Sequence, residues 1–153
     1  DDIAAYVSEM MEDEPDTYFV MGSGSTVGAI MEYLGLENTL LGVDVVRQGK
    51  REASDVTASQ LIALTQGKPC KVVLTVIGGQ GHLLGRGNQQ LSPEFIRHVG
   101  KQNMIVVATK QKIRGLHGKP LRLDSGDERL DAQLSGAFTI ITGYKDKVLY
   151  NAV

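Results

Sequence analysis

KVVLTVIGGQGHLLGRGNQQLSPEFIR occupies residues 71–97 and carries the strongest structural signals of the chain. Residues 72–77 form an unbroken apolar run, as is typical of strands buried on both faces of a parallel sheet. Five glycines and several polar side chains follow this run. Ser92 and Pro93 then predict the N-cap and the first residue of a helix. The stretch therefore predicts a strand, a glycine-rich loop and a helix.

Such a loop can bind an anion, because glycines let backbone N–H groups approach a ligand closely and a helix N-terminus adds partial positive charge. The alternative is a surface loop that only joins two elements. An apolar strand that leads directly into glycines and amides favours a binding site. His82 lies in the same loop and is a candidate for acid–base chemistry, although an isolated loop histidine is more often solvated.

A second unit of the same kind precedes it. Residues 17–21 (TYFVM) predict a buried strand, residues 22–26 read GSGST, and the apolar spacing of the next residues predicts an amphipathic helix that ends at Gly35. Hydroxyls and N–H groups at the start of this helix could hold a phosphate. Alternatively, Ser25 or Thr26 only caps the helix.

Asp44 interrupts a third apolar segment, residues 40–46 (LLGVDVV). A carboxylate inside an apolar strand is costly unless it is paired or lies at a strand end that faces a cleft. Asp44 is therefore a weak candidate for a catalytic base or a ribose acceptor, and equally a candidate for a hydrogen-bonded structural carboxylate. Glu94 is the other weak catalytic candidate. No residue is assigned as a metal ligand.

The remaining elements are expected at the following places. We expect a helix over residues 3–11, a polar loop over 47–55, a helix that begins with a capping box at residues 57–60 and runs to residue 66, a strand over 103–109, a basic segment over 110–122, a short strand over 120–124, a helix over 127–134, and strands over 137–143 and 148–153. The last two strands should pair antiparallel.

Strands alternate with helices through the first 109 residues. This order predicts an α/β fold, a three-layer sandwich with a mainly parallel, Rossmann-like sheet and an antiparallel C-terminal strand pair. We expect residues 1–153 to form a single domain. The two glycine loops should lie at the carboxyl ends of neighbouring strands and form one cleft.

Composition and charge narrow the function classes. A net charge of −2 gives no reason to expect a nucleic-acid or anionic-membrane partner. The single cysteine, Cys70, cannot form an internal disulfide, and a cytoplasmic location is the simplest expectation. The chain begins at Asp1 without an initiator methionine, so we expect it to be the C-terminal fragment of a longer chain.

The sequence resembles the carboxyl-terminal domain of ATP-NAD kinase family proteins, among them microbial ones associated with acetoin catabolism. The resemblance rests on GSGSTVGAI (22–30), LLGVDVV (40–46), IGGQGHLLGRGNQQLSPEFIR (77–97), IVVATKQKI (105–113), LRLDSGDERLDAQLSG (121–136) and TGYKD (142–146). It implies phosphoryl transfer from ATP, or from polyphosphate, to the 2′-hydroxyl of the adenosine ribose of NAD. It also implies ATP and Mg²⁺ as cofactors, NAD as substrate, and a partner N-terminal domain of the same chain.

The sequence departs from this family at one important place. The family's GGDGT signature, whose Asp acts as base, belongs to the N-terminal half, and Gln80 stands at the matching place of the similar run Gly78-Gly79-Gln80-Gly81. The fragment alone should therefore be inactive, while the full-length chain should be an NAD kinase-like phosphotransferase. The sequence is also similar to ribose-5-phosphate isomerase and related sugar-phosphate proteins, on GSGST and ATKQKI, but Ile77 stands where a catalytic lysine would precede the glycines.

We therefore expect a domain that binds a nucleotide or phosphate and leaves the catalytic residues to other sequence. The predicted binding residues are Gly22, Ser23, Gly24, Ser25, Thr26, Gly78, Gly79, Gln80, Gly81, Arg86, Asn88 and Gln89. The alternatives are a non-catalytic sugar-phosphate or nucleotide sensor and a structural or dimerising domain. Homo-oligomerisation is left open by the sequence.

Overall fold

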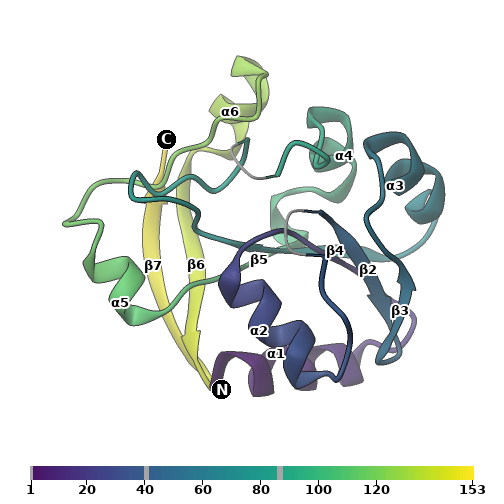
Figure 1. Cartoon of the computed structure of the whole chain (residues 1–153). Helices are drawn as coiled ribbons and strands as arrows, with labels where there is room; N and C mark the ends of the chain where they lie inside the picture. The colour runs from purple at the N-terminus through teal and green to yellow at the C-terminus, as the bar shows by residue number, and fades with distance from the viewer. Residues whose placement is uncertain (1, 40–41, 86–87) are drawn as a thin grey trace.

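The computed structural model of the chain describes residues 2–39, 42–85 and 88–153. Within these ranges, one mixed sheet contains seven strands in the order β3-β2-β1-β4-β5-β6-β7 (Figure 1). The strands are β1 (Tyr18–Met21), β2 (Asp44–Arg47), β3 (Lys50–Ala53), β4 (Cys70–Thr75), β5 (Met104–Val107), β6 (Gly136–Gly143) and β7 (Asp146–Ala152).

The sheet has a parallel centre and an antiparallel pairing toward each edge. The pairs β1–β4, β4–β5 and β5–β6 are parallel, whereas β1–β2, β2–β3 and β6–β7 are antiparallel. The α/β class and the antiparallel C-terminal pair are confirmed. The expectation of a mainly parallel sheet was wrong. The strands β2 and β3 form a hairpin, and β2 pairs antiparallel with β1.

That hairpin occupies the segment for which we expected a polar loop. The turn residues Gln48 and Gly49 both have positive φ angles, of 54° and 72°, as tight hairpin turns require. β3 is an edge strand with three exposed residues out of four. Because β3 is polar and exposed, a search for apolar runs in the sequence does not find it. A strand of this kind is possible at the edge of an antiparallel pairing, where side chains can remain in water. The predicted strand over residues 40–46 is shorter than expected and begins at Asp44; residues 40 and 41 lie outside the described ranges.

Helices cover both faces of the sheet (Figure 1). The helices are α1 (Asp2–Asp13), α2 (Ser25–Tyr33), α3 (Ala58–Thr65), α4 (Pro93–Val99), α5 (Lys110–Arg114) and α6 (Glu128–Leu134). Buried residues of α1 and α2 form one apolar cluster with one face of the strands, and those of α3, α4 and α6 form a second cluster with the opposite face. The three-layer arrangement is the one that the sequence predicts.

Local capping signals explain where several helices begin. Thr57 and Gln60 form the reciprocal capping box at α3. Ser92 accepts a hydrogen bond from the Phe95 N–H, and Pro93 is the first residue of α4. These predictions are confirmed. α5 was not predicted, and residues 120–124 contribute only isolated bridges at Leu121 and Arg122 in place of a strand.

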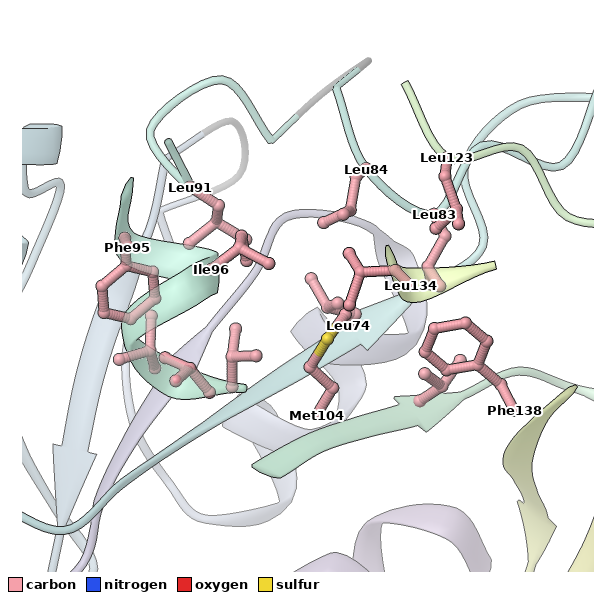
Figure 2. Close-up of a cluster of buried hydrophobic side chains, with 14 of the residues drawn as sticks. Leu74, Leu83, Leu84, Leu91, Phe95, Ile96, Met104, Leu123, Leu134 and Phe138 are labelled. Atoms are coloured by element: carbon pink, nitrogen blue, oxygen red, sulfur yellow. The ribbon is translucent and has the colours of Figure 1, made fainter. Parts of the chain in front are cut away.

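The larger apolar cluster packs against the glycine-rich loop between β4 and α4. Figure 2 shows Leu83, Leu84 and Leu91 of the loop lying with Phe95 and Ile96 of α4 and with Leu74, in an apolar group over the sheet. Leu83, Phe95, Ile96 and Leu74 have no exposed surface. Burial of apolar side chains at both ends of the loop fixes its path over the strand ends. In the described ranges, no helix has the length and apolar character needed to cross a membrane.

Candidate functional site

The two glycine loops leave neighbouring parallel strands at the same edge of the sheet. From β1 the chain passes to α2 and then to β2 on one side of β1; from β4 it passes to α4 and then to β5 on the other side. α2 and α4 also lie on opposite faces. The carboxyl ends of β1 and β4 therefore form the point where successive connections diverge, which is where open α/β sheets bind ligands.

Asn88 joins the two loops. Its side-chain Oδ1 accepts hydrogen bonds from the Ser23 backbone N–H at 3.0 Å and from the Ser23 hydroxyl at 3.1 Å. Asn88 is 1% exposed, and its Nδ2 donates to no described residue. A buried amide with one unused donor group is unusual, because burial without a hydrogen bond costs free energy.

A cavity of about 980 Å³ opens beside the first loop. It lies between Ser23, Gly24 and Ser25 of the loop, the outer face of α2, the segment that follows α2, and Ile77 of the second loop. Ligand sites for small molecules are typically of this size and largely apolar. The predicted residues Ser23, Gly24 and Ser25 are thus brought together around one space.

The start of α2 is open to this cavity. The N-cap residue is Gly24, with φ 118°, and no side chain accepts a hydrogen bond at this helix end. The alternative in which Ser25 or Thr26 caps the helix is therefore wrong. Gly24 is also required by packing, since a Cβ there would lie 2.4 Å from Thr75 Cγ2. The first N–H groups of the helix thus keep their capacity to bind an acceptor.

A second, smaller hollow of about 360 Å³ lies next to the residues of the second loop that follow Ile77. Gly78 and Gly79 line it together with Thr109, Lys112 and Leu116. The Lys112 Nζ donates a hydrogen bond of 2.9 Å to the Gly78 carbonyl. The two glycine loops, which we expected to form one cleft, therefore line two separate spaces.

Other predicted residues lie apart from these two spaces. Gln80 borders a separate hollow beside Lys119 and Arg122, and Asn88 and Gln89 border another beside Ser125. Gly81 is buried, and a Cβ there would lie 2.8 Å from the Leu116 side chain. Gly22, with Val73 and Asn88 packed against it, and Thr26, in the first turn of α2, border neither space. Arg86 lies outside the described residues.

The geometry favours a structural role for Asp44. It lies opposite Met21 at the carboxyl end of β1, because β2 is antiparallel to β1 and begins there. Its carboxylate is 1% exposed and accepts hydrogen bonds from the backbone N–H groups of Thr39, at 2.9 Å, and Asp55, at 3.0 Å. These bonds hold the segment that precedes β2 and the segment that follows β3. Glu94 is exposed in the first turn of α4.

His82 is buried, so the expectation of a solvated histidine was wrong. It is 8% exposed, and its backbone pairs with Ile77 and Arg122. Its Nδ1 bonds to no described residue. His82 lines neither of the two spaces.

Several residues that line the two spaces were missed from the sequence. Glu32, Leu36, Glu37 and Asn38 line the larger cavity, and Thr109 and Lys112 line the smaller hollow. The signal for the second set was available, because Thr109 lies two residues after the end of β5, and parallel strands end at one edge. The signal for the first set was weak, because neither the exposed side of a helix nor an irregular segment after it indicates which residues face a cavity.

The described residues do not supply a recognisable Mg²⁺ site. No group of three or more His, Cys, Asp or Glu side chains is gathered within the described ranges. Glu32 and Glu37 border the larger cavity as exposed side chains. The described side chains at these spaces therefore do not fit an Mg²⁺ ion.

The seven-stranded mixed sheet with helices on both faces defines an α/β domain. A comparison with protein-family models identifies which one: the ATP-NAD kinase C-terminal domain matches residues 14–152. The chain belongs to this family, as the resemblance of its motifs predicted. A search of the curated proteins and a search of the solved structures each gave no match.

Proposed function

We propose that this chain is the nucleotide-binding C-terminal domain of a kinase that converts NAD to NADP. The observation that carries the proposal is the cavity of about 980 Å³ at the carboxyl end of β1, which Ser23, Gly24 and Ser25 of the first loop line. Membership of the ATP-NAD kinase family supports a nucleotide as its occupant.

The cavity divides into an end for an anion and an end for a base. Backbone N–H groups at residues 24–26 start α2 without a side-chain cap and can donate to a phosphate. Ala29, Leu36 and Ile77 give the rest of the cavity an apolar lining that suits the flat face of a base. Arg86 is proposed to neutralise ligand charge.

Catalysis is proposed to need the N-terminal domain of the longer protein. Gln80 carries an amide and cannot accept a proton from the ribose hydroxyl in the way that a carboxylate does. Asp44 holds backbone N–H groups with both carboxylate oxygens. The chain is thus proposed to bind and orient the nucleotide, while the general base and the remaining ligands of ATP come from the partner domain.

A steric block tests this proposal. Ala29 lines the cavity on α2, and Ala29→Phe would fill it with an aromatic ring. We expect isothermal titration to show NAD or ATP binding to the wild type and its loss in Ala29→Phe. Ala132→Phe is the matched control, because Ala132 is an exposed helical alanine on α6, away from the cavity. Equal binding by Ala29→Phe and the wild type would contradict the proposal.

A further inference from the structure

Charge is distributed unequally between the two spaces at the carboxyl edge. The charged residues among the described lining of the larger cavity are Glu32 and Glu37, both exposed at its rim. Glu37 has one distant ion-pair partner, Arg51, at 3.9 Å. The smaller hollow contains the opposite charge, on Lys112. A ligand with several negative groups would therefore be attracted toward the smaller hollow and away from the carboxylate rim.

Lys112 is an unusual lysine for this surface. It is half-buried, its Nζ is held by the Gly78 carbonyl, and it forms no ion pair with a described Asp or Glu. Lys110, two residues earlier, pairs with Asp146 at 2.6 Å. A carbonyl oxygen uses one of the three ammonium donors, so two remain for an anion. A half-buried lysine without a carboxylate partner gains most from a ligand that brings negative charge.

Consecutive residues of the second loop line the two spaces. Ile77 lines the larger cavity, and the next two residues, Gly78 and Gly79, line the hollow. The spaces lie at the ends of β1, β4 and β5, which are neighbours in the sheet. Strands lie about 4.8 Å apart, so the ends of β1 and β5 are separated by about 10 Å. A phosphate chain attached to a nucleoside can span a distance of the order of this strand-end separation.

We infer that the hollow at Lys112 binds a second phosphoryl group of the nucleotide in the cavity. The base and ribose occupy the apolar cavity, the first phosphate lies at the start of α2, and the next phosphate passes Gly78 and Gly79 to Lys112. Lys112 is then the residue that makes the site prefer a chain of two or more phosphates to a monophosphate. This inference rests on the proposed function.

The test compares AMP with ADP by isothermal titration. In the wild type, ADP should bind more tightly than AMP. Lys112→Gln keeps an N–H donor for the Gly78 carbonyl and removes the charge, and should weaken ADP binding about tenfold while leaving AMP binding unchanged. Lys112→Arg should retain the preference for ADP. Lys68→Gln is the matched control, because Lys68 is exposed before β4, at the opposite edge of the sheet, and its loss changes net charge equally.

Each outcome separates the inference from the proposed function. If AMP and ADP both bind and Lys112→Gln weakens neither, the second phosphate site is overturned while the nucleotide-binding role stands. If neither nucleotide binds the wild type, the proposed function fails. Pyrophosphate then decides the remaining question: binding that Lys112→Gln abolishes supports an anion site in the hollow, and its absence in the wild type overturns it.

Discussion

Asn88 Oδ1 lies 3.0 Å from the backbone nitrogen of Ser23, although the two residues are 65 positions apart in the chain. The same oxygen accepts a hydrogen bond from the Ser23 hydroxyl. One buried amide thereby fixes the loop after β1 to the loop after β4. We expect the shapes of the two spaces to depend on this contact, because it holds the second loop against the first.

Replacing Asn88 with Ala should therefore reduce stability and ligand affinity together. Removing the acceptor that both Ser23 donors share should lower the free energy of unfolding by about 1–3 kcal/mol. Urea unfolding measures this change. Gln89→Ala, at the adjacent exposed position, should change stability by less than about 0.5 kcal/mol. Equal stability of the two variants would mean that the loops are held by other contacts.

Gly24→Ala should destabilise the start of α2. The new Cβ would lie 2.4 Å from Thr75 Cγ2, and φ at this position is 118°. Overpacking and an unfavourable φ each cost about 1–3 kcal/mol, so thermal unfolding should occur at a clearly lower temperature. Thr75→Ser in the same protein removes the clashing methyl group, so the double variant should regain part of the lost thermal stability. Gly79→Ala is the control, since a Cβ there meets nothing within 4 Å.

Asp44→Asn separates a structural carboxylate from a catalytic one. The amide keeps one acceptor oxygen, so one of the N–H groups of Thr39 and Asp55 loses its partner. We expect a loss of about 1–3 kcal/mol in urea unfolding, with ligand affinity falling only as far as the fold is weakened. Unchanged stability, combined with lost turnover in the longer protein, would instead establish a catalytic role.

The parts of the fold that follow from local chemistry could be predicted from the sequence. The capping residues Thr57 and Ser92 and the apolar runs of β4 and β5 are short-range signals, and they correctly place α3, α4 and two central strands. β3 could not be predicted in this way, because an exposed edge strand has no apolar run and depends on pairing with β2. The antiparallel direction of β2 was missed for the same reason.

The part of the candidate site that lies at the first glycine loop was predictable from the sequence. A strand followed by glycines and hydroxyls indicated Ser23, Gly24 and Ser25, which line the larger cavity. Lys112 belongs to a basic segment whose position depends on α5, a five-residue helix with no buried residue and hence no apolar pattern. Asn88 shows a further limit: its sequence context indicated a ligand contact, and its oxygen is bound to another loop.

The Cys70 thiol should be unreactive in the folded protein. Burial raises the pKa of Cys70 from 9.0 to about 12, so very little thiolate exists at pH 8. Reaction with Ellman's reagent at pH 8 should be slow in buffer and fast in urea. Unfolding restores the lower pKa, so the unfolded state loses its proton first as pH rises. Ionisation of this thiol should therefore lower the free energy of unfolding as the pH rises from 9 to 12. In Cys70→Ala, the free energy of unfolding should fall less over the same pH range.

The most direct test of nucleotide binding is thermal unfolding of this chain with ATP, NAD, NADP, ribose 5-phosphate and inorganic phosphate. A ligand at a hundredfold excess over its dissociation constant should stabilise the chain by about 2.7 kcal/mol. We predict a higher unfolding temperature with ATP or NAD, reduced in Arg86→Ala and in Ser25→Ala. A shift with ribose 5-phosphate alone, or with none of these ligands, would contradict the account.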